Sequence, residues 1–221
     1  MNVKYYGHSC FLIKTYDDVK LIIDPWISNP LSPIIDANDL KEKIDYILIT
    51  HDHNDHTGDF ESIADIHKAT IIGVFEFVKD LPYQTIPCNV GGTIKLSDET
   101  SVYVTNALHS CSKGTPVGYI IESDFTIYHA GDTAVFSEIE LYKEMFDIEL
   151  ALLPIGGTFT MNTKTVLKAL ELLEPKKFIP MHYNTFDAIK VSEEELRELE
   201  EKTKEMGIEF VKLMPGEELN L

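Results

Sequence analysis

The stretch IDYILITHDHNDH, residues 44–56, is the most informative part of this sequence. Residues 44–50 form a mostly apolar run that predicts a buried strand. Four side chains that can bind metal follow within six residues: His51, His53, Asp55 and His56. Imidazole nitrogen and carboxylate oxygen are ligands that suit Zn²⁺ and its neighbours. The stretch therefore predicts a strand that carries a metal-binding cluster at its carboxyl end.

The spacing within the cluster has a physical meaning. Residues i and i+2 of an extended segment point the same way, so His51 and His53 can bind one ion together. Asp55 and His56 come after the chain turns into a helix, and they can face a second ion. The plain alternative is a solvated loop that is rich in histidine. The agreement between ligand types and strand-end placement favours the metal site.

Four further candidate ligands lie far from this stretch, each after an apolar strand: Asp24, His109, Asp132 and His182. Repeated use of strand ends predicts one shared rim where loops converge. On that rim His109 would complete the first ion's ligands and His182 the second's. The two oxygens of Asp132 allow it to bridge both ions. His67 and His129 are expected to be ordinary surface or packed histidines.

These motifs resemble the metallo-β-lactamase superfamily over essentially the whole chain. The resemblance is carried by residues 51–56, by His109, and by Ala130-Gly-Asp-Thr133 and Met181-His-Tyr-Asn184. Gly7-His-Ser9, Pro154-Ile-Gly-Gly157 and Ile179-Pro-Met-His-Tyr-Asn184 are similar to a branch of metal-dependent hydrolases related to ascorbate-6-phosphate lactonases. The resemblance implies a dinuclear site with His51, His53 and His109 on one metal, Asp55, His56 and His182 on the other, and Asp132 bridging.

The resemblance and the order of elements both predict an α+β fold, a four-layer αββα sandwich of two mixed β-sheets with helices on the outer faces. We expect one domain over residues 1–221. The predicted strands are 2–6, 9–15, 19–24, 44–50, 70–74, several within 84–110, 117–122, 126–129, 148–155, 176–181 and 208–213. The predicted helices are 59–67, 75–81, 136–145, one capped by Asn162 or Thr163, and one that begins with a Ser192–Glu195 capping box and stops at Gly207.

Length and composition set bounds on the class of protein. The chain has 221 residues, and 44% of them are apolar, enough for a sizeable core. No apolar run approaches the roughly 18 residues that span a bilayer, and no signal peptide is visible. The three cysteines, Cys10, Cys88 and Cys111, are far apart and form no metal or disulfide pattern. Free thiols fit a reducing compartment, so we expect a cytoplasmic protein without a membrane partner.

The net charge of −18 opposes binding to RNA or DNA, because nucleic-acid affinity rests on Lys and Arg. Arg197 is the only arginine and lies in the acidic run 192–205, so an arginine clamp on substrate is not expected. Lysine, backbone amides or metal would have to hold an anionic group. We expect a small-molecule substrate and no nucleic-acid partner, and the sequence leaves homo-oligomer formation open.

Several residues near the motifs are candidates for substrate contact or for orienting the ligands. Asp24 can orient a metal-bound histidine, His8 can line the pocket, and Lys113 is the best cation for holding substrate. Gly157 lies where backbone N–H groups can bind an anion, and Tyr183 and Asn184 can donate to an oxyanion. Each has a structural alternative: a turn residue before Pro25, a packed histidine, a solvated lysine or a tight turn.

The expected reaction is hydrolysis by a water that two divalent metal ions activate, on an ester, lactone or phosphodiester-type substrate. Zinc is the default for these ligands, with manganese or iron as alternatives. Asp55 and Asp132 are the expected catalytic carboxylates. The competing hypotheses are a metal-dependent nuclease or RNA-processing phosphodiesterase, a single-iron oxidoreductase, and a non-catalytic metal-binding scaffold. His53 stands where the flavodiiron oxidoreductases of the superfamily carry a glutamate, which disfavours oxygen reduction.

Overall fold

The computed structural model describes all residues from 1 to 221 and contains two seven-stranded sheets. Both sheets are mixed, with one antiparallel half and one parallel half. The first sheet contains, in spatial order, β14 (Glu218–Asn220), β1 (Asn2–Gly7), β2 (Cys10–Lys14), β3 (Lys20–Ile23), β4 (Tyr46–Leu48), β5 (Thr70–Val74) and β6 (Thr85–Cys88). The second contains β13 (Glu209–Phe210), β12 (Lys177–Met181), β11 (Leu150–Pro154), β10 (Thr126–His129), β9 (Val117–Glu122), β8 (Ser101–Asn106) and β7 (Thr93–Lys95).

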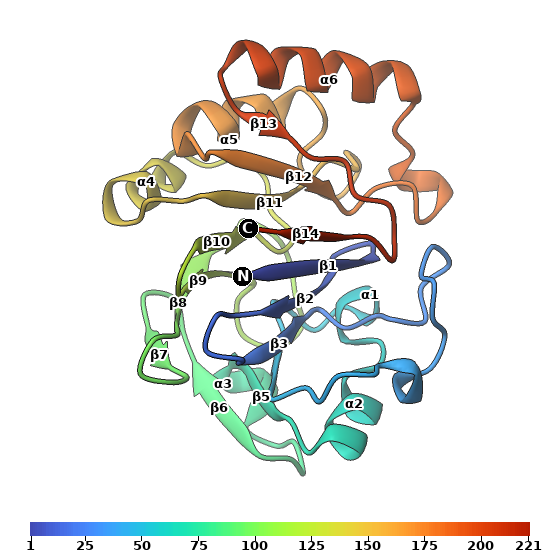
Figure 1. The fold of residues 1–221 in the computed structure, drawn as a ribbon, viewed down its shortest axis with the longest axis vertical. Helices are drawn as coiled ribbons and strands as arrows, with labels where there is room; N and C mark the ends of the chain where they lie inside the picture. Colours follow the sequence, from blue (N-terminus) through green and yellow to red (C-terminus); the bar gives the residue numbers. More distant parts are fainter.

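Helices cover the outer side of each sheet (Figure 1). α2 (Phe60–His67) and α3 (Phe75–Val78) lie beside the first sheet. α4 (Glu140–Met145), α5 (Thr165–Leu173) and α6 (Glu193–Glu205) lie beside the second. A single helical turn, α1 (Asn54–Thr57), follows the histidine motif, and three short 3-10 segments cover Ala37–Asp39, Ser137–Ile139 and Asp187–Ile189. The predicted αββα sandwich is therefore confirmed.

The alternation of side chains along the strands builds two cores. In β9, Tyr119 and Ile121 belong to the larger cluster of 37 buried residues, which lies between the sheets and under α2. Ile120, between them, belongs to a cluster of 21 buried residues shared with α4, α5 and α6. Successive side chains of a strand point to opposite faces, so a strand with both faces covered must be apolar throughout. This explains the continuous apolar runs in the sequence.

Element boundaries differ from the prediction in a few places. The predicted strand 44–50 is regular only at Tyr46–Leu48, and the predicted strand 208–213 only at Glu209–Phe210. The predicted helix 136–145 begins as a 3-10 turn, and α5 starts at Thr165, after Asn162 accepts backbone hydrogen bonds from residues 164 and 165. The strand β14 was not predicted, because its short polar sequence becomes a strand only by pairing with β1.

The parallel halves of the sheets direct several chain segments to one edge. β3 and β4 are parallel neighbours, as are β10, β11 and β12. Parallel strands present their carboxyl ends at the same edge of a sheet, which is where ligands bind in such sheets. Asp24, His51, Asp132 and His182 all lie just after these strands. The three cysteines are free, and none of the helices is long and apolar enough to cross a membrane.

Candidate metal centre

Seven predicted ligands from four separate chain segments meet at this edge. Their donor atoms form three groups that could hold metal, each with all atoms within 4.8 Å of one another. One group is His51, His53 and His109, and one is His51, His56 and Asp132. The third is Asp55, His56 and His182, together with His8. The structure thus brings the 51–56 stretch, His109, Asp132 and His182 together.

The first group has the spacing of ligands on a common ion. His51 Nε2 lies 2.9 Å from His53 Nδ1, and the ring of His109 is 5.1 Å from that of His51 and 5.2 Å from that of His53. Two nitrogens bound at about 2.0–2.1 Å to a tetrahedral ion lie about 3.3 Å apart. His51 and His53 approach each other this closely because residues i and i+2 of extended chain share one side.

Asp132 lies at the centre of the cluster. One carboxylate oxygen, Oδ1, is 3.4 Å from His56 Nε2, and the other, Oδ2, is 3.0 Å from His182 Nε2 and 3.6 Å from His109 Nε2. Gly131 allows this position: its φ is 61°, and a Cβ there would lie 2.7 Å from the carbonyl oxygen of Val117. The two oxygens of one carboxylate therefore face different histidines.

Two of the buried histidines are held by a second hydrogen bond. His56 Nδ1 donates to Asp24 Oδ2 at 2.7 Å, and His51 Nδ1 lies 3.0 Å from Thr50 Oγ1. Asp24 is fully buried and also accepts from the backbone N–H and the hydroxyl of Thr50. Such contacts fix the tautomer of a metal-binding histidine so that its Nε2 is free for the ion. The expectation that Asp24 orients a histidine agrees with this geometry.

Replacing Asp24 with asparagine is expected to weaken metal binding by about 10–100-fold, the usual effect of losing an orienting carboxylate. Asparagine keeps the size and tolerates the left-handed backbone of Asp24, whose φ is 47°. A titration against a competing chelator measures the change. Asp17→Asn is the matched control. Like Asp24, Asp17 accepts three hydrogen bonds, here all from hydroxyls, but it lies in the β2–β3 turn. Equal affinities for both variants would contradict this role of Asp24.

The electrostatics of the cluster favour a bound cation. Burial disfavours ionisation of Asp132, but the nearby His56 and His182 outweigh it and hold the pKa of Asp132 well below its usual range. Burial lowers the pKa of His51 to about 2, which leaves this imidazole neutral. Burial also acts against the charge of His182, but Asp132 raises its pKa to about 9. Two ionised carboxylates thus attract positive charge, and a metal ion supplies it by displacing protons.

Several buried polar atoms of the cluster have no hydrogen-bond partner. They are Nε2 of His56, Oδ1 of Asp132 and both ring nitrogens of His182. His182 Nε2 lies at ion-pair distance from Asp132 Oδ2, 3.0 Å, but without hydrogen-bond geometry. An unpaired buried polar group costs about 1–3 kcal/mol, more when it is charged, so native structures rarely keep several together without a ligand. The donor set and these atoms fit a metal.

A pocket of about 350 Å³ opens onto the cluster. Besides metal-capable groups it is lined by Ser110, Phe159 and Phe186. Sequence reasoning missed these three, and no motif could have identified them, because they lie in irregular loops. The complete lining is His53, Asp55, His109, Ser110, Asp132, Phe159, His182 and Phe186.

The other candidates lie outside this pocket. Lys113 is exposed, and its Nζ lies 5.8 Å from the centre of the Phe77 ring. Tyr183 lines a different pocket with Tyr5 and Leu31. Asn184 accepts a hydrogen bond from the backbone of Val191, and Gly157 forms a turn with a φ of 84°. Of the secondary candidates, only His8 and Asp24 touch the cluster.

The comparisons with known proteins agree with this geometry. A family model described as a β-lactamase superfamily domain matches residues 2–182. A UPF0173 metal-dependent hydrolase of Pyrobaculum islandicum is 43% identical over the full length of both chains. Another, from Staphylothermus marinus, is 44% identical over 97% of this chain and 96% of its own.

A solved structure extends the similarity to three dimensions. Igni18, a metallo hydrolase from Ignicoccus hospitalis, superimposes with a TM-score of 0.93 at 38% identity, covering 99% of this chain and 97% of its own. The similarity of sequence and fold runs through all the strands that carry the site. The chain is a metal-dependent hydrolase and belongs to the β-lactamase superfamily.

Proposed function

We propose that this hydrolase uses two divalent metal ions to activate water against an ester, lactone or phosphodiester-type bond of a small molecule. The observation that carries the proposal is the position of Asp132. Oδ1 faces His56, and Oδ2 faces His182 and His109. A carboxylate that bridges two ions must face ligands of both in this way. A metal site that opens onto a pocket suits catalysis better than a purely structural role, because catalytic sites keep a coordination position for water or substrate.

The residues divide between the two metal positions. His51, His53 and His109 would hold one ion and Asp55, His56 and His182 the other, with Asp132 shared between them. Zinc is the expected metal for this set, with manganese and iron as alternatives. Ions in these positions lower the pKa of a bound water and polarise the bond under attack.

The two carboxylates have different surroundings and therefore different tasks. The side chain of Asp132 is only 3% exposed, so its role is to hold the metals. The side chain of Asp55 is 27% exposed and lines the pocket, so it can accept a hydrogen bond from the attacking water. The neighbouring histidines keep the pKa of Asp55 below its usual value despite its burial, so the group is ionised at neutral pH.

The pocket favours an uncharged substrate. None of its eight lining residues is Lys or Arg, and two are phenylalanines. With His182 bound to metal, a phosphate or carboxylate on the substrate would find no lysine or arginine there, and only metal would offset its charge. Phe159 and Phe186 offer aromatic surface to an organic group beside the metal-binding side chains. We therefore place neutral esters and lactones ahead of phosphodiesters.

A metal-loaded sample assayed on phenyl esters, lactones and bis(p-nitrophenyl) phosphate tests this order. We expect the highest kcat/KM on the neutral esters or lactones. Phe159→Ala should then lower kcat/KM for a phenyl ester by roughly 5–10-fold, the effect of losing about 1 kcal/mol of aromatic contact. Phe75→Ala is the control, since Phe75 is 52% exposed and Phe159 is 54% exposed but Phe75 does not line the pocket. Preference for the phosphodiester, with no effect of Phe159→Ala, would contradict the proposal.

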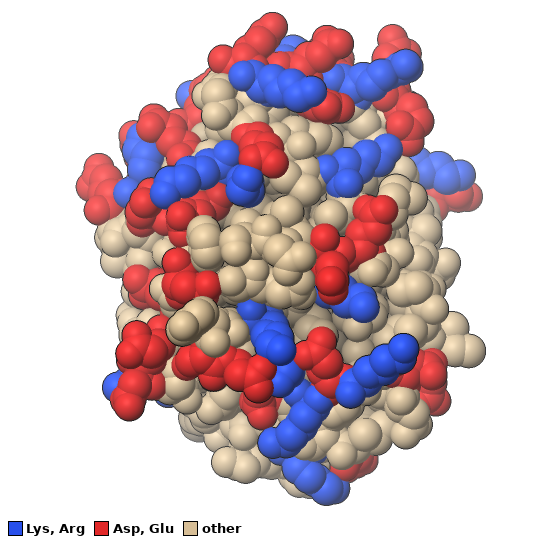
Figure 2. Space-filling view, in the orientation of Figure 1, with Lys and Arg blue, Asp and Glu red and all other residues tan.

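The surface supports a function that does not involve nucleic acid. On the face that Figure 2 shows, Lys and Arg side chains lie among Asp and Glu, and those that gather in its lower part have acidic side chains beside them. Several lysines are paired locally, such as Lys14 and Lys20 with Asp18. With a net charge of −18, the chain would repel a polyanion over most of its surface. Tight RNA binding that falls steeply with salt would contradict this view.

A further inference from the structure

His8 lies on the turn between β1 and β2 and is fully buried. Its backbone has a left-handed φ of 57°, which is uncommon for a residue with a side chain. Its carbonyl oxygen accepts a hydrogen bond of 2.8 Å from the backbone N–H of His182. This bond joins the first strand pair to the loop that carries a proposed metal ligand. The turn is therefore fixed against the metal centre.

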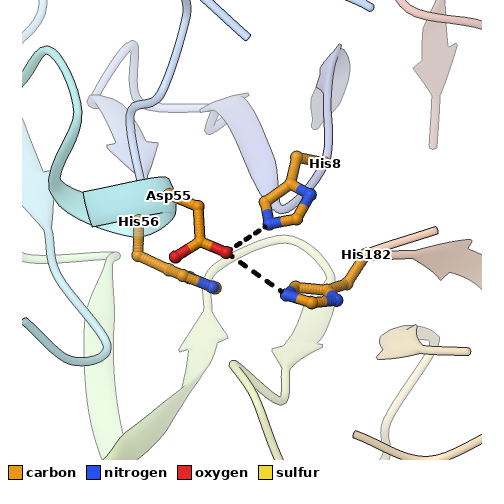
Figure 3. Close-up of side chains that lie close together, drawn as sticks. All are labelled: His8, Asp55, His56 and His182. Atoms are coloured by element: carbon orange, nitrogen blue, oxygen red, sulfur yellow. Dashed lines mark hydrogen bonds and ion pairs between the residues drawn. The ribbon is translucent and has the colours of Figure 1, made fainter. Parts of the chain in front are cut away.

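The ring of His8 faces the group formed by Asp55, His56 and His182 (Figure 3). His8 Nε2 lies 3.1 Å from Asp55 Oδ2, and His182 Nε2 lies 3.8 Å from the same oxygen. The ring centroids of His8 and His182 are 4.1 Å apart. Atoms at adjacent corners of an octahedron with bonds of about 2.1 Å lie about 3.0 Å apart, so the separation of His8 Nε2 and Asp55 Oδ2 suits ligands of one ion.

The other ring nitrogen of His8 is held by a hydroxyl. His8 Nδ1 lies 2.8 Å from Thr185 Oγ1, and Thr185 is buried. His51 with Thr50, and His56 with Asp24, show the same arrangement. A metal-binding histidine usually has its second nitrogen held in this way, with the first turned toward the ion. His8 thus shares the environment of the proposed ligands.

Resting on the proposed function, we propose that His8 binds the second metal through Nε2, together with Asp55, His56 and His182. With Asp132 shared, this position has five protein donors, whereas the position of His51, His53 and His109 has four. Five donors and one solvent molecule make a six-coordinate site, which suits manganese, iron or cobalt. Four donors, three of them imidazoles, suit zinc. The two positions therefore differ in geometry and in metal preference.

Cobalt substitution distinguishes a ligand from a residue that only orients Asp55. Six-coordinate cobalt absorbs weakly in the visible range, and cobalt with fewer ligands absorbs strongly. We expect His8→Asn, which tolerates the left-handed backbone but is too short to reach the ion, to weaken binding of the second cobalt by more than about 100-fold. The first cobalt should be retained. His67→Ala is the control, because His67 lies on α2 outside the cluster and should change neither affinity.

His8→Gln tests the alternative directly. Its amide can donate a hydrogen bond to Asp55 from the place of Nε2. If His8 only orients Asp55, this variant keeps both affinities and the wild-type spectrum, and that result would overturn the proposal. If His8 is a ligand, glutamine does not restore the second site. Circular dichroism checks that each variant is folded.

A measurement on the wild-type protein keeps the proposal testable if the variants fail to fold. In cobalt-loaded protein labelled with ¹⁵N-histidine, metal-bound imidazoles give strongly shifted resonances. Six shifted imidazoles support the proposal, since the three groups contain six histidines including His8, and five overturn it. A wild-type protein that binds fewer than two metals refutes the dinuclear function itself. Two metals with five shifted imidazoles refute only the role of His8.

Discussion

Asp132→Ala is expected to reduce kcat/KM by at least about 10³-fold and to remove bound metal. Metal ions in such sites stabilise the transition state by several kcal/mol, and each 1.4 kcal/mol or so changes the rate tenfold. Asp132 faces His109 as well as His56 and His182, so its loss should disturb both proposed metal positions. It also leaves buried histidines without their anionic partner.

The measurement combines metal analysis with steady-state kinetics on the best substrate of the panel. Asp52→Ala is the matched control, because Asp52 lies inside the same motif but accepts a hydrogen bond from the backbone of Ser112 and belongs to none of the ligand groups. The control should keep metal and most of its activity. A fully metal-loaded Asp132→Ala variant with normal activity would refute the proposed centre.

Removal of metal by a chelator is expected to lower the melting temperature by roughly 10 °C. A ligand at about 1,000 times its Kd stabilises the folded state by about 4 kcal/mol, and 1 kcal/mol shifts the melting temperature of a chain of this size by about 2–4 °C. The cluster joins segments of both sheets, and without a bound cation several of its buried ring nitrogens have no hydrogen-bond partner. Removal of metal therefore destabilises the folded state more than the unfolded chain.

Thermal unfolding with EDTA, followed by re-addition of zinc or manganese, gives the measurement. The shift should reverse on re-addition. Asp132→Ala provides the control, since a variant that has already lost metal should respond little to the chelator. A wild-type protein that loses its metal without a change in melting temperature would show that the centre does not stabilise the fold.

Much of the fold could be predicted because strands buried on both faces must be apolar over their whole length. The runs that became β9, β11 and β12 are mainly apolar, although β9 contains Gly118 and β12 contains Pro180. The capping box of Ser192 and Glu195 was equally readable, and the structure contains it. β14 could not be predicted in this way, because its stability comes from its partner β1 rather than from its own residues.

The metal centre was predictable for a related reason. Histidine and aspartate directly after apolar strands are costly to bury unless they bind something, so their positions identify the shared rim. Loop residues carry no comparable signal. Lys113 was the best cation by position along the chain, yet it packs over Phe77, and Phe159 and Phe186 line the pocket instead.

The sequence by itself determined that this chain is a β-rich sandwich and that histidines and acids at strand ends gather into a cluster that can hold metal. Both follow from local rules: which side chains tolerate burial, and which way successive residues point. Only the tertiary structure decided that His8 lies against this cluster and that Lys113, Tyr183 and Asn184 do not. Those outcomes depend on contacts such as His8 with Thr185, 177 residues apart in the chain, which form only when the two sheets pack.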